Sequence, residues 1–158
     1  MDSYWASSAI YRKSTSWCWF SMGSGVISWF NRKQSCVALI TAKAKYVAAC
    51  SATYEVVWLR KLLSNLFDLQ LDATCIYCDN QSCVNLSENA MFHENSKHIE
   101  IKYHYIRHMA QRRAMKFQYV ATNEQIVDVF IKPLVKVKFE YFNKKLGVLQ
   151  IELPSKGK

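Results

Sequence analysis

The stretch that decides the fold runs from Thr74 to Ser82 and reads TCIYCDNQS. Thr74 to Cys78 is a short apolar run that predicts a buried strand. Asp79 follows directly, and the polar residues after it lead into a short helix that we expect to end near Glu88. In α/β folds, ligand-binding and catalytic groups commonly lie at the carboxyl ends of strands. Asp79 is therefore the first candidate functional residue.

The chain before this stretch predicts strands and one long helix. Ser14 to Met22 is rich in aromatic and hydroxyl side chains, and a glycine-containing turn separates it from a second strand, Val26 to Phe30. Cys36 to Ile40 is a further short apolar run that predicts a third strand. A long helix is then expected from its N-cap, Thr41, to about Phe67, with an inward stripe of Val47, Cys50, Tyr54, Val57 and Leu62 and with Ala48, Ala49 and Ala52 allowing close packing.

The chain after Glu88 predicts helices alternating with a strand. A helix is expected over His98 to Arg113, with Ile99, Tyr103, Ile106 and Met109 or Ala110 inward, and a strand over Met115 to Val120. A short helix that holds Asp128 follows; we expect Thr122 or Asn123 to cap it and Pro133 to stop it. A last helix is expected over Val137 to Leu146, ended by Gly147. Strands first, then helices between strands, indicate an α/β fold with one mixed sheet covered by helices. We expect one domain over residues 1–148 and a flexible tail over 149–158.

The composition narrows the class of protein. A chain of 158 residues fits one domain and buries enough surface for a core. Hydrophobic residues make up 51% and charged residues 21%, which is typical of globular rather than disordered chains. No apolar run approaches the roughly 20 residues of a membrane span, and Met1 to Ser8 lacks the features of a secretory signal. We expect an intracellular protein, cytoplasmic or nuclear, with no membrane partner.

The cysteines are expected to be reduced thiols. There are six of them: Cys18, Cys36, Cys50, Cys75, Cys78 and Cys83. Because nothing indicates secretion, we expect them to be mostly buried rather than paired in disulfides. Cys75 and Cys78 do form a C-x-x-C pair, but a zinc site needs a second ligand pair, and His93 lies ten residues beyond Cys83. Zinc is therefore the weaker interpretation.

The net charge of +9 comes from 21 Lys and Arg against 12 Asp and Glu. The excess lies mainly in the second half of the chain, at Lys97, Lys102, Arg107, Arg112, Arg113, Lys116, Lys132, Lys136, Lys138, Lys144 and Lys145. A basic surface attracts phosphate backbones without regard to base sequence. The alternative is a merely solvated cationic surface, and charge alone leaves the two open.

A second carboxylate lies where burial is expected. Asp128 is inside the apolar run Ile126 to Ile131, and a buried carboxylate needs a hydrogen bond, an opposite charge or a metal. The simpler alternative is that Asp79 caps the helix that follows it and that Asp128 is solvated. Taken alone, the two residues favour the simpler alternative.

Several motifs nevertheless occur in a specific order. They are RKSTSW (Arg12 to Trp17) with ISW (Ile27 to Trp29) and KQSCVAL (Lys33 to Leu39), IYCDNQS (Ile76 to Ser82), FHENSKHIEIKYHYIR (Phe92 to Arg107), QIVDVFIKPL (Gln125 to Leu134) and KFEYFNKKLGV (Lys138 to Val148). Together they resemble the ribonuclease H domain at the end of a copia-type retrotransposon Pol polyprotein. The resemblance covers about residues 2–148, nearly the whole chain.

This resemblance implies a ribonuclease H-like mixed β-sheet flanked by α-helices, with the first strand largely missing because the family's strand begins before the residue that Asp2 matches. It also implies an endonuclease that hydrolyses the RNA strand of an RNA–DNA hybrid with two divalent ions, Mg²⁺ or Mn²⁺. Such ions activate the attacking water and stabilise the leaving oxygen, and they prefer oxygen ligands. Three of the four carboxylates that hold them are matched, by Asp2, Asp79 and Asp128.

The fourth carboxylate is replaced. In ITAKAKY (Ile40 to Tyr46), Lys45 stands where the family has the metal-binding glutamate, and Lys43 stands at another glutamate. An ammonium offers no lone pair and repels a cation, so Lys45 removes a ligand and adds an opposing charge. Glu55 is ten residues on, about 15 Å along a helix axis at about 1.5 Å per residue, and cannot substitute. Taken alone, the two lysines would be read as ordinary solvated residues.

The resemblance also suggests contacts with the substrate. It places Lys97, His98, Lys102 and Arg107 at the nucleic acid, and for His98 and His104 it favours structural hydrogen bonds over a zinc or general-base role. Tyr4 replaces a further aspartate of the family. The implied partners are an RNA–DNA hybrid or another nucleic acid, and the remainder of a Pol polyprotein.

Three functional hypotheses follow. The favoured one is a ribonuclease H-like domain that is catalytically dead because of Lys45 and the short first strand. The second is a hydrolase that works with three aspartates and fewer metals. The third is a non-catalytic, basic module that binds nucleic acid through phosphates and 2′-hydroxyls.

Overall fold

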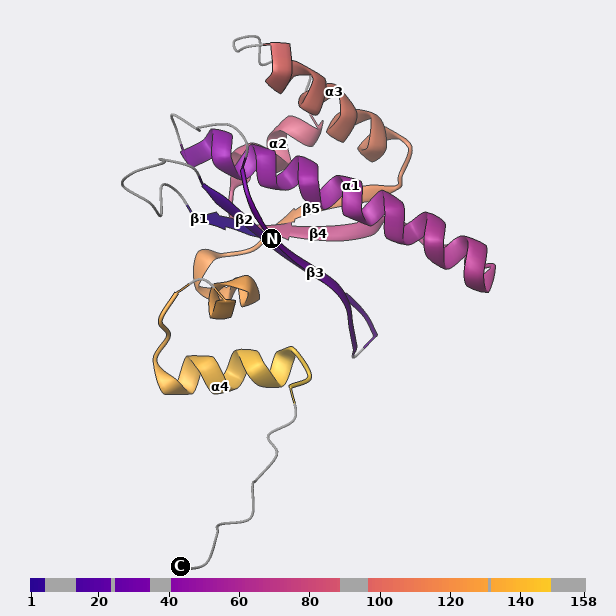
Figure 1. Ribbon diagram of the computed structural model, residues 1–158. Coiled ribbons are helices and arrows are strands. Elements are labelled where there is room, and N and C mark those ends of the chain that lie inside the picture. The colour runs from indigo at the N-terminus through magenta and orange to yellow at the C-terminus, as the bar shows by residue number, and fades with distance from the viewer. Residues whose placement is uncertain (5–13, 24, 35–40, 89–96, 131, 149–158) are drawn as a thin grey trace, which may run out of the picture.

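Two small sheets lie between two layers of helices (Figure 1). The computed structural model describes residues 1–4, 14–23, 25–34, 41–88, 97–130 and 132–148. An antiparallel sheet has the order β1-β2-β3, made of β1 (Asp2–Tyr4), β2 (Thr15–Met22) and β3 (Gly25–Lys33). A parallel pair is made of β4 (Thr74–Cys78) and β5 (Met115–Tyr119).

The helices divide between the two faces of these sheets. One face carries α1 (Thr41–Phe67), α2 (Gln81–Glu88) and α3 (Lys97–Gln111), which lie above the sheets in Figure 1. The other face carries the short 3₁₀ segments η1 (Thr122–Glu124) and η2 (Ile126–Phe130), and α4 (Lys136–Lys145). The α/β fold predicted from the sequence is confirmed, and the arrangement is consistent with a ribonuclease H-like sheet flanked by helices.

The predicted hairpin is present and longer than expected. β2 and β3 pair antiparallel, with a register shift between Phe20 and Ser21, and β3 continues past Phe30 to Lys33. Gly23, in the turn, has a φ of 61°, a conformation that glycine adopts without steric cost. The third strand predicted for residues 36–40 lies outside the described residues, as does the predicted tail, 149–158.

β1 is short and forms an edge of the antiparallel sheet, beside β4 of the other sheet. Its three residues pair with the first part of β2, so that Asp2 lies opposite Trp17. Met1 precedes it, 5% exposed, and its amino group donates a hydrogen bond of 2.9 Å to the Tyr77 carbonyl in β4. The start of the chain thus joins the two sheets.

The buried face of α1 differs from the predicted stripe. The most buried side chains of this helix are small, and they include Ala44, Ala48, Ala49 and Ala52, with Cys50, Thr53 and Val56. Of the predicted stripe, Cys50 is buried, but Tyr54 and Leu62 are exposed by 52% and 36%. The alanines let the helix backbone approach the sheet closely, and this rotates the larger residues to the rim. There Tyr54 stacks on Tyr105 of α3, with ring centroids 4.2 Å apart.

The segment after β5 is the second departure from prediction. The structure has η1 and η2 in place of one helix capped by Thr122 or Asn123. The break falls at Gln125, which has an extended backbone (φ −71°, ψ 104°) and donates its side-chain amide to the Met1 carbonyl at 2.9 Å. A continued helix would turn this side chain away from Met1. The last helix, α4, is as predicted, with Gly147 at a φ of 73° after its end.

The described cysteines are free thiols, as expected. Cys18, Cys50 and Cys78 are buried, and Cys75 is partly exposed. Burial raises the pKa of Cys18 to about 11, and it does the same for Cys50, so both thiols stay protonated at neutral pH. Within the described residues, no helix combines the length and the apolar character needed to cross a bilayer.

The packing of α3 against α1 yields a first prediction. Ile106 is 1% exposed, whereas Ile101 on the same helix is 65% exposed. We expect Ile106→Ala to lower the free energy of unfolding by about 2–5 kcal/mol, because it deletes buried methylene groups and leaves a cavity. Ile101→Ala is the matched control and should change little. Urea unfolding measures both, and equal effects would contradict the observed orientation of α3.

Candidate functional site

Asp79 is turned away from the helix that follows it. The cap of α2 comes from Asn80, whose side-chain oxygen accepts a hydrogen bond of 2.8 Å from the Ser82 amide. The backbone amide of Asn80 donates in turn to the Cys78 sulfur at 3.4 Å, and this contact holds Asn80 in place. The simpler interpretation of Asp79 as a helix cap is therefore wrong, because Asn80 caps α2. The Asp79 carboxylate makes a different contact.

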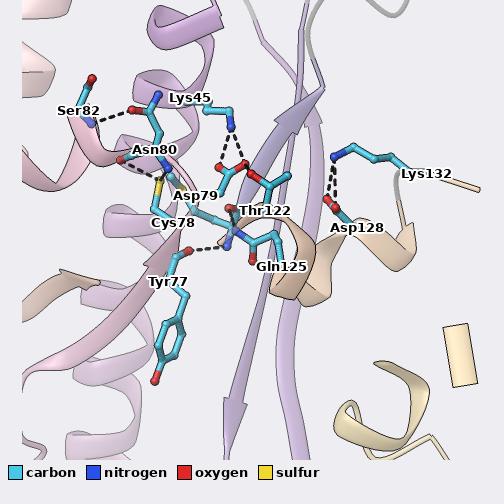
Figure 2. Close-up of polar contacts among 11 residues, drawn as sticks. Lys45, Tyr77, Cys78, Asp79, Asn80, Ser82, Thr122, Gln125, Asp128 and Lys132 are labelled. Carbon is cyan, nitrogen blue, oxygen red and sulfur yellow. Dashed lines mark hydrogen bonds and ion pairs between the residues drawn. The ribbon is translucent and has the colours of Figure 1, made fainter. Parts of the chain in front are cut away.

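That contact is Lys45. The Lys45 ammonium lies 2.7 Å from both carboxylate oxygens of Asp79 (Figure 2). The pair is well shielded from water, with side-chain exposures of 16% for Lys45 and 3% for Asp79. Thr122, at the start of η1, donates a weaker hydrogen bond of 3.4 Å to the same carboxylate. The ion pair thus joins the first turns of α1 to the carboxyl end of β4.

The first turns of α1 are held firmly in this position. Ala44 and Tyr46, on either side of Lys45, are buried. The Gln34 side-chain amide donates hydrogen bonds of 2.8 Å to the Ala44 carbonyl and to the Ser16 hydroxyl, so it ties the helix to the hairpin. Because the backbone on both sides is fixed, the Lys45 side chain has a defined direction toward β4.

Asp128 is also buried and paired with a lysine. It is 3% exposed, and the Lys132 ammonium lies 3.1 and 3.2 Å from its two oxygens. The Lys132 amide also donates to the Asp128 carbonyl at 2.9 Å. The alternative that Asp128 is solvated is therefore wrong. Figure 2 shows this pair beside the pair formed by Lys45 and Asp79, with Thr122 and Gln125 between them.

The backbone of Asp2 lies at the same end of the fold as Asp79 and Asp128. β1 lies beside β2, and the residue before Asp2 contacts both Tyr77 and Gln125. The Asp2 side chain lies outside the described part of the structure, so its predicted role as a metal ligand stays a prediction. The segments that carry Asp79 and Asp128 are thus joined through η1, and Met1 links the start of β1 to both of them.

Sequence reasoning missed three residues that make polar contacts in this part of the fold. They are Thr122, Gln125 and Lys132, which contact Asp79, Met1 and Asp128. Lys132 had a readable signal, because a lysine four residues after an aspartate favours an ion pair. Thr122 and Gln125 act across more than 40 residues of sequence, as their separations of 43 and 124 show, so no local pattern indicated them.

The described residues do not fit a two-metal centre. In the part of the chain that the structure describes, no group of three or more His, Cys, Asp or Glu could hold a metal ion. Asp79 and Asp128 each form an ion pair with a lysine ammonium. Two unit charges about 4 Å apart interact by roughly 4 kcal/mol at a protein surface, and a divalent ion doubles this repulsion. A cation at Asp79 would have to displace Lys45 or tolerate its charge.

The predicted substrate contacts lie on α3. Lys102 is half-buried near α1, where its charge opposes the larger effect of burial on the pKa of Cys50. Arg107 is also half-buried, and the side chains of Lys97 and His98 lie outside the described residues. Past the last turn of this helix, Arg112 and Arg113 are exposed. Contact of these residues with nucleic acid stays a prediction.

The ion pair of Lys45 and Asp79 yields a second prediction. We expect Lys45→Met to lower the free energy of unfolding at neutral pH by about 3–5 kcal/mol, because it leaves a buried carboxylate without its partner charge. The double variant Lys45→Met with Asp79→Asn should recover most of this loss, since no unpaired charge remains. Denaturant unfolding of the two single variants and the double variant measures the coupling.

The control for this cycle is an exposed pair. Lys136 and Glu140 lie 3.9 Å apart with side-chain exposures of 86% and 48%, so Lys136→Met should cost less than about 1 kcal/mol. A Lys45→Met protein as stable as the Lys136→Met protein would show that the contact at Asp79 carries no structural weight.

Known proteins similar to this chain include polyproteins of transposons. It is 38% identical over 137 residues to the retrovirus-related Pol polyprotein from transposon TNT 1-94 of Nicotiana tabacum, which is 87% of this chain and 10% of that protein. It is 34% identical over 156 residues to the corresponding polyprotein from transposon RE2 of Arabidopsis thaliana, 99% of this chain and 11% of that protein. Transposon RE1 of the same plant gives 33% identity over 150 residues, 95% of this chain and 10% of that protein.

No family model and no solved structure matches the chain. The chain spans about a tenth of the length of the curated relatives it matches. Its homologues over most of its length are therefore retrovirus-related Pol polyproteins from transposons, and it corresponds to one region of such a polyprotein.

Proposed function

We propose that this chain is the ribonuclease H-like domain of a copia-type retrotransposon polyprotein and that it does not hydrolyse RNA–DNA hybrids. The ordered motifs, the α/β fold and the similarity to Pol polyproteins support the first part. The second part rests on one observation, the Lys45 ammonium 2.7 Å from both oxygens of Asp79.

This pair opposes metal catalysis in two ways. Two-metal hydrolysis needs carboxylate oxygens that face the ions and offset their charge. Here the Asp79 oxygens face an ammonium, and the pair has no net charge to offer a cation. Lys132 has the same effect on Asp128. An ammonium on a buried, anchored helix turn is also costly to move, because its departure leaves Asp79 buried and unpaired.

The direct test is hydrolysis of a labelled RNA–DNA hybrid. We expect no cleavage of the RNA strand with Mg²⁺ or with Mn²⁺, under conditions where an active ribonuclease H cuts the same substrate. Turnover that Asp79→Asn abolishes would overturn the proposal, since it would show that Asp79 supports catalysis despite Lys45.

A second test asks whether Lys45 is what excludes the ion. Lys45→Glu places a second carboxylate beside Asp79, and the repulsion between the two is relieved by a bound cation. We expect Mn²⁺ at millimolar concentration to raise the Tm of this variant by several degrees and to leave the parent protein unchanged. Lys61→Glu, on the exposed side of α1, is the control for charge alone. An equal response of all three proteins to Mn²⁺ would remove Lys45 from the explanation.

Loss of hydrolysis leaves binding of nucleic acid as a second candidate function. The chain carries a charge of +9, and Arg112, Arg113 and Lys116 are exposed where α3 ends and β5 begins. Side chains of this kind contact phosphates, and A-form duplexes are held through phosphates and 2′-hydroxyls rather than base edges. We propose that the domain binds RNA–DNA hybrid weakly and without sequence preference.

Such binding predicts a strong dependence on salt. A protein that contacts several phosphates loses roughly 10³-fold or more in affinity between 50 and 200 mM salt, with a smaller loss for fewer contacts. We expect Arg112→Ala with Arg113→Ala to weaken binding and to flatten the salt slope, and Lys61→Ala to do neither. Fluorescence anisotropy with a labelled hybrid measures both, and a flat salt response of the parent protein would exclude this function.

A further inference from the structure

The hairpin of β2 and β3 has one face turned toward α1 and one turned away from it. On the face toward α1, Phe30 is buried, and the Ser28 hydroxyl donates a hydrogen bond of 2.9 Å to Glu55 of α1. Successive side chains of a strand point to opposite faces of a sheet. Trp29, between these two residues, therefore lies on the face away from α1, and its side chain is 69% exposed.

Three further aromatic side chains lie on the same side of the sheet as Trp29. Trp19 is its cross-strand partner, and Trp17 precedes Trp19 by two residues, or about 6.6 Å of strand. Trp17 stacks on Phe130 of η2, with ring planes 3° from parallel and ring centroids 6.1 Å apart. Phe130 is itself 48% exposed. We call these four residues the aromatic platform. Exposed apolar patches of this kind mark binding surfaces.

The charges around the aromatic platform select an anionic partner. Of the 12 acidic residues of the chain, Asp2 is the first and Glu55 the second, so the hairpin contains none. Lys33 lies on the same face of β3 as the platform, and Arg32 is next to it on this edge strand; both are exposed. On the same side of the sheet, η2 packs against β2 and against α4, whose ten residues include four lysines and one glutamate.

A single strand of nucleic acid has both properties that this surface requires. Its phosphates are anionic, and the faces of its unpaired bases are flat and apolar. Bases stack on exposed aromatic side chains without regard to sequence, and basic side chains beside those rings hold the backbone. In a duplex, by contrast, the bases are stacked on one another, so their faces cannot reach a protein ring. The platform therefore fits an unpaired strand and not a hybrid.

We infer that the aromatic platform binds single-stranded RNA or DNA by stacking of unpaired bases on Trp29 and Trp19. The cations of the hairpin and of α4 hold the phosphates of the same strand. This site is separate from Arg112 and Arg113, which follow α3 and to which the proposed binding of a hybrid is assigned. It adds a second ligand, an unpaired strand, to the proposed function.

The test compares two fluorescently labelled strands that have the same length and the same charge. One is an oligothymidylate of about 12 nucleotides, within the range that one single-strand site covers. The other is an abasic strand with the same number of phosphates. Fluorescence anisotropy at low salt measures the affinity of the full-length protein for each. The abasic strand keeps the attraction of the phosphates and lacks every stacking contact, so the ratio of the two affinities isolates stacking.

We expect the parent protein to bind the oligothymidylate roughly 5- to 150-fold more tightly than the abasic strand, the range that stacking of one base gives. Trp29→Ala should remove most of this difference, and Trp29→Phe, which keeps a ring, should restore part of it. Trp58→Ala is the matched control, because Trp58 is 55% exposed on α1, which covers the opposite face of the sheet. It should leave the difference unchanged.

Equal affinity of the parent protein for the two strands would overturn the inference, and that measurement needs no variant. Equal losses in Trp29→Ala and Trp58→Ala would also overturn it. A dimer that Trp29→Ala dissociates, with the ratio of affinities unchanged, would show by sedimentation that a second copy of this chain covers the platform instead. A blunt-ended RNA–DNA hybrid should bind Trp29→Ala as tightly as the parent protein, so failure of this inference leaves the proposed binding of hybrids intact.

Discussion

The contact between Lys45 and Asp79 joins the longest helix to the middle of the molecule. The two residues are 34 apart in sequence, yet the ammonium bridges both carboxylate oxygens in a site that is nearly closed to water. Buried ion pairs often add little net stability over apolar residues of the same size, but breaking one side of such a pair is costly. The pair therefore ties α1 to the carboxyl end of β4, and the loss of either partner alone is expected to be costly. The proposed loss of metal binding rests on a charge of this sign in this place.

Much of the fold follows from local pattern. The apolar run of β4, the aromatic hairpin and α1 were predicted within a few residues of their observed bounds, because each has a periodicity that one structure satisfies. The orientation of α1 was not predicted. The hydrophobic pattern placed the larger side chains of α1 in the core, whereas the alanines are buried because they allow close approach to the sheet. Tyr54 packs against Tyr105 of α3 instead. The break at Gln125 likewise depends on Met1, at the other end of the sequence.

The sequence named several residues of the candidate site but not the contacts between them. The motifs named Asp79, Asp128 and Lys45, and the joint role of the aspartates as metal ligands stays a prediction. That Lys45 would contact Asp79 directly could not be read from the sequence, since a lysine near the start of a helix is usually solvated. The choice between a capping and a buried Asp79 was decided by Asn80, which takes the capping role. Local capping preferences allow either residue, and the contact of Asp79 with Lys45, 34 residues away in sequence, discriminates between them.

Met1 and the ion pair of Lys45 with Asp79 hold the same end of the molecule by different physical means. The Met1 nitrogen donates to the Tyr77 carbonyl in β4, and the Met1 carbonyl accepts the Gln125 side-chain amide beside η2. These contacts use main-chain atoms of Met1, and they leave the charge beside Asp79 unchanged. Lys45 sets that charge, because its ammonium lies 2.7 Å from both Asp79 oxygens. Under the proposed function, it is therefore repulsion by this ammonium, and not the order of the chain around Met1, that keeps a cation from Asp79.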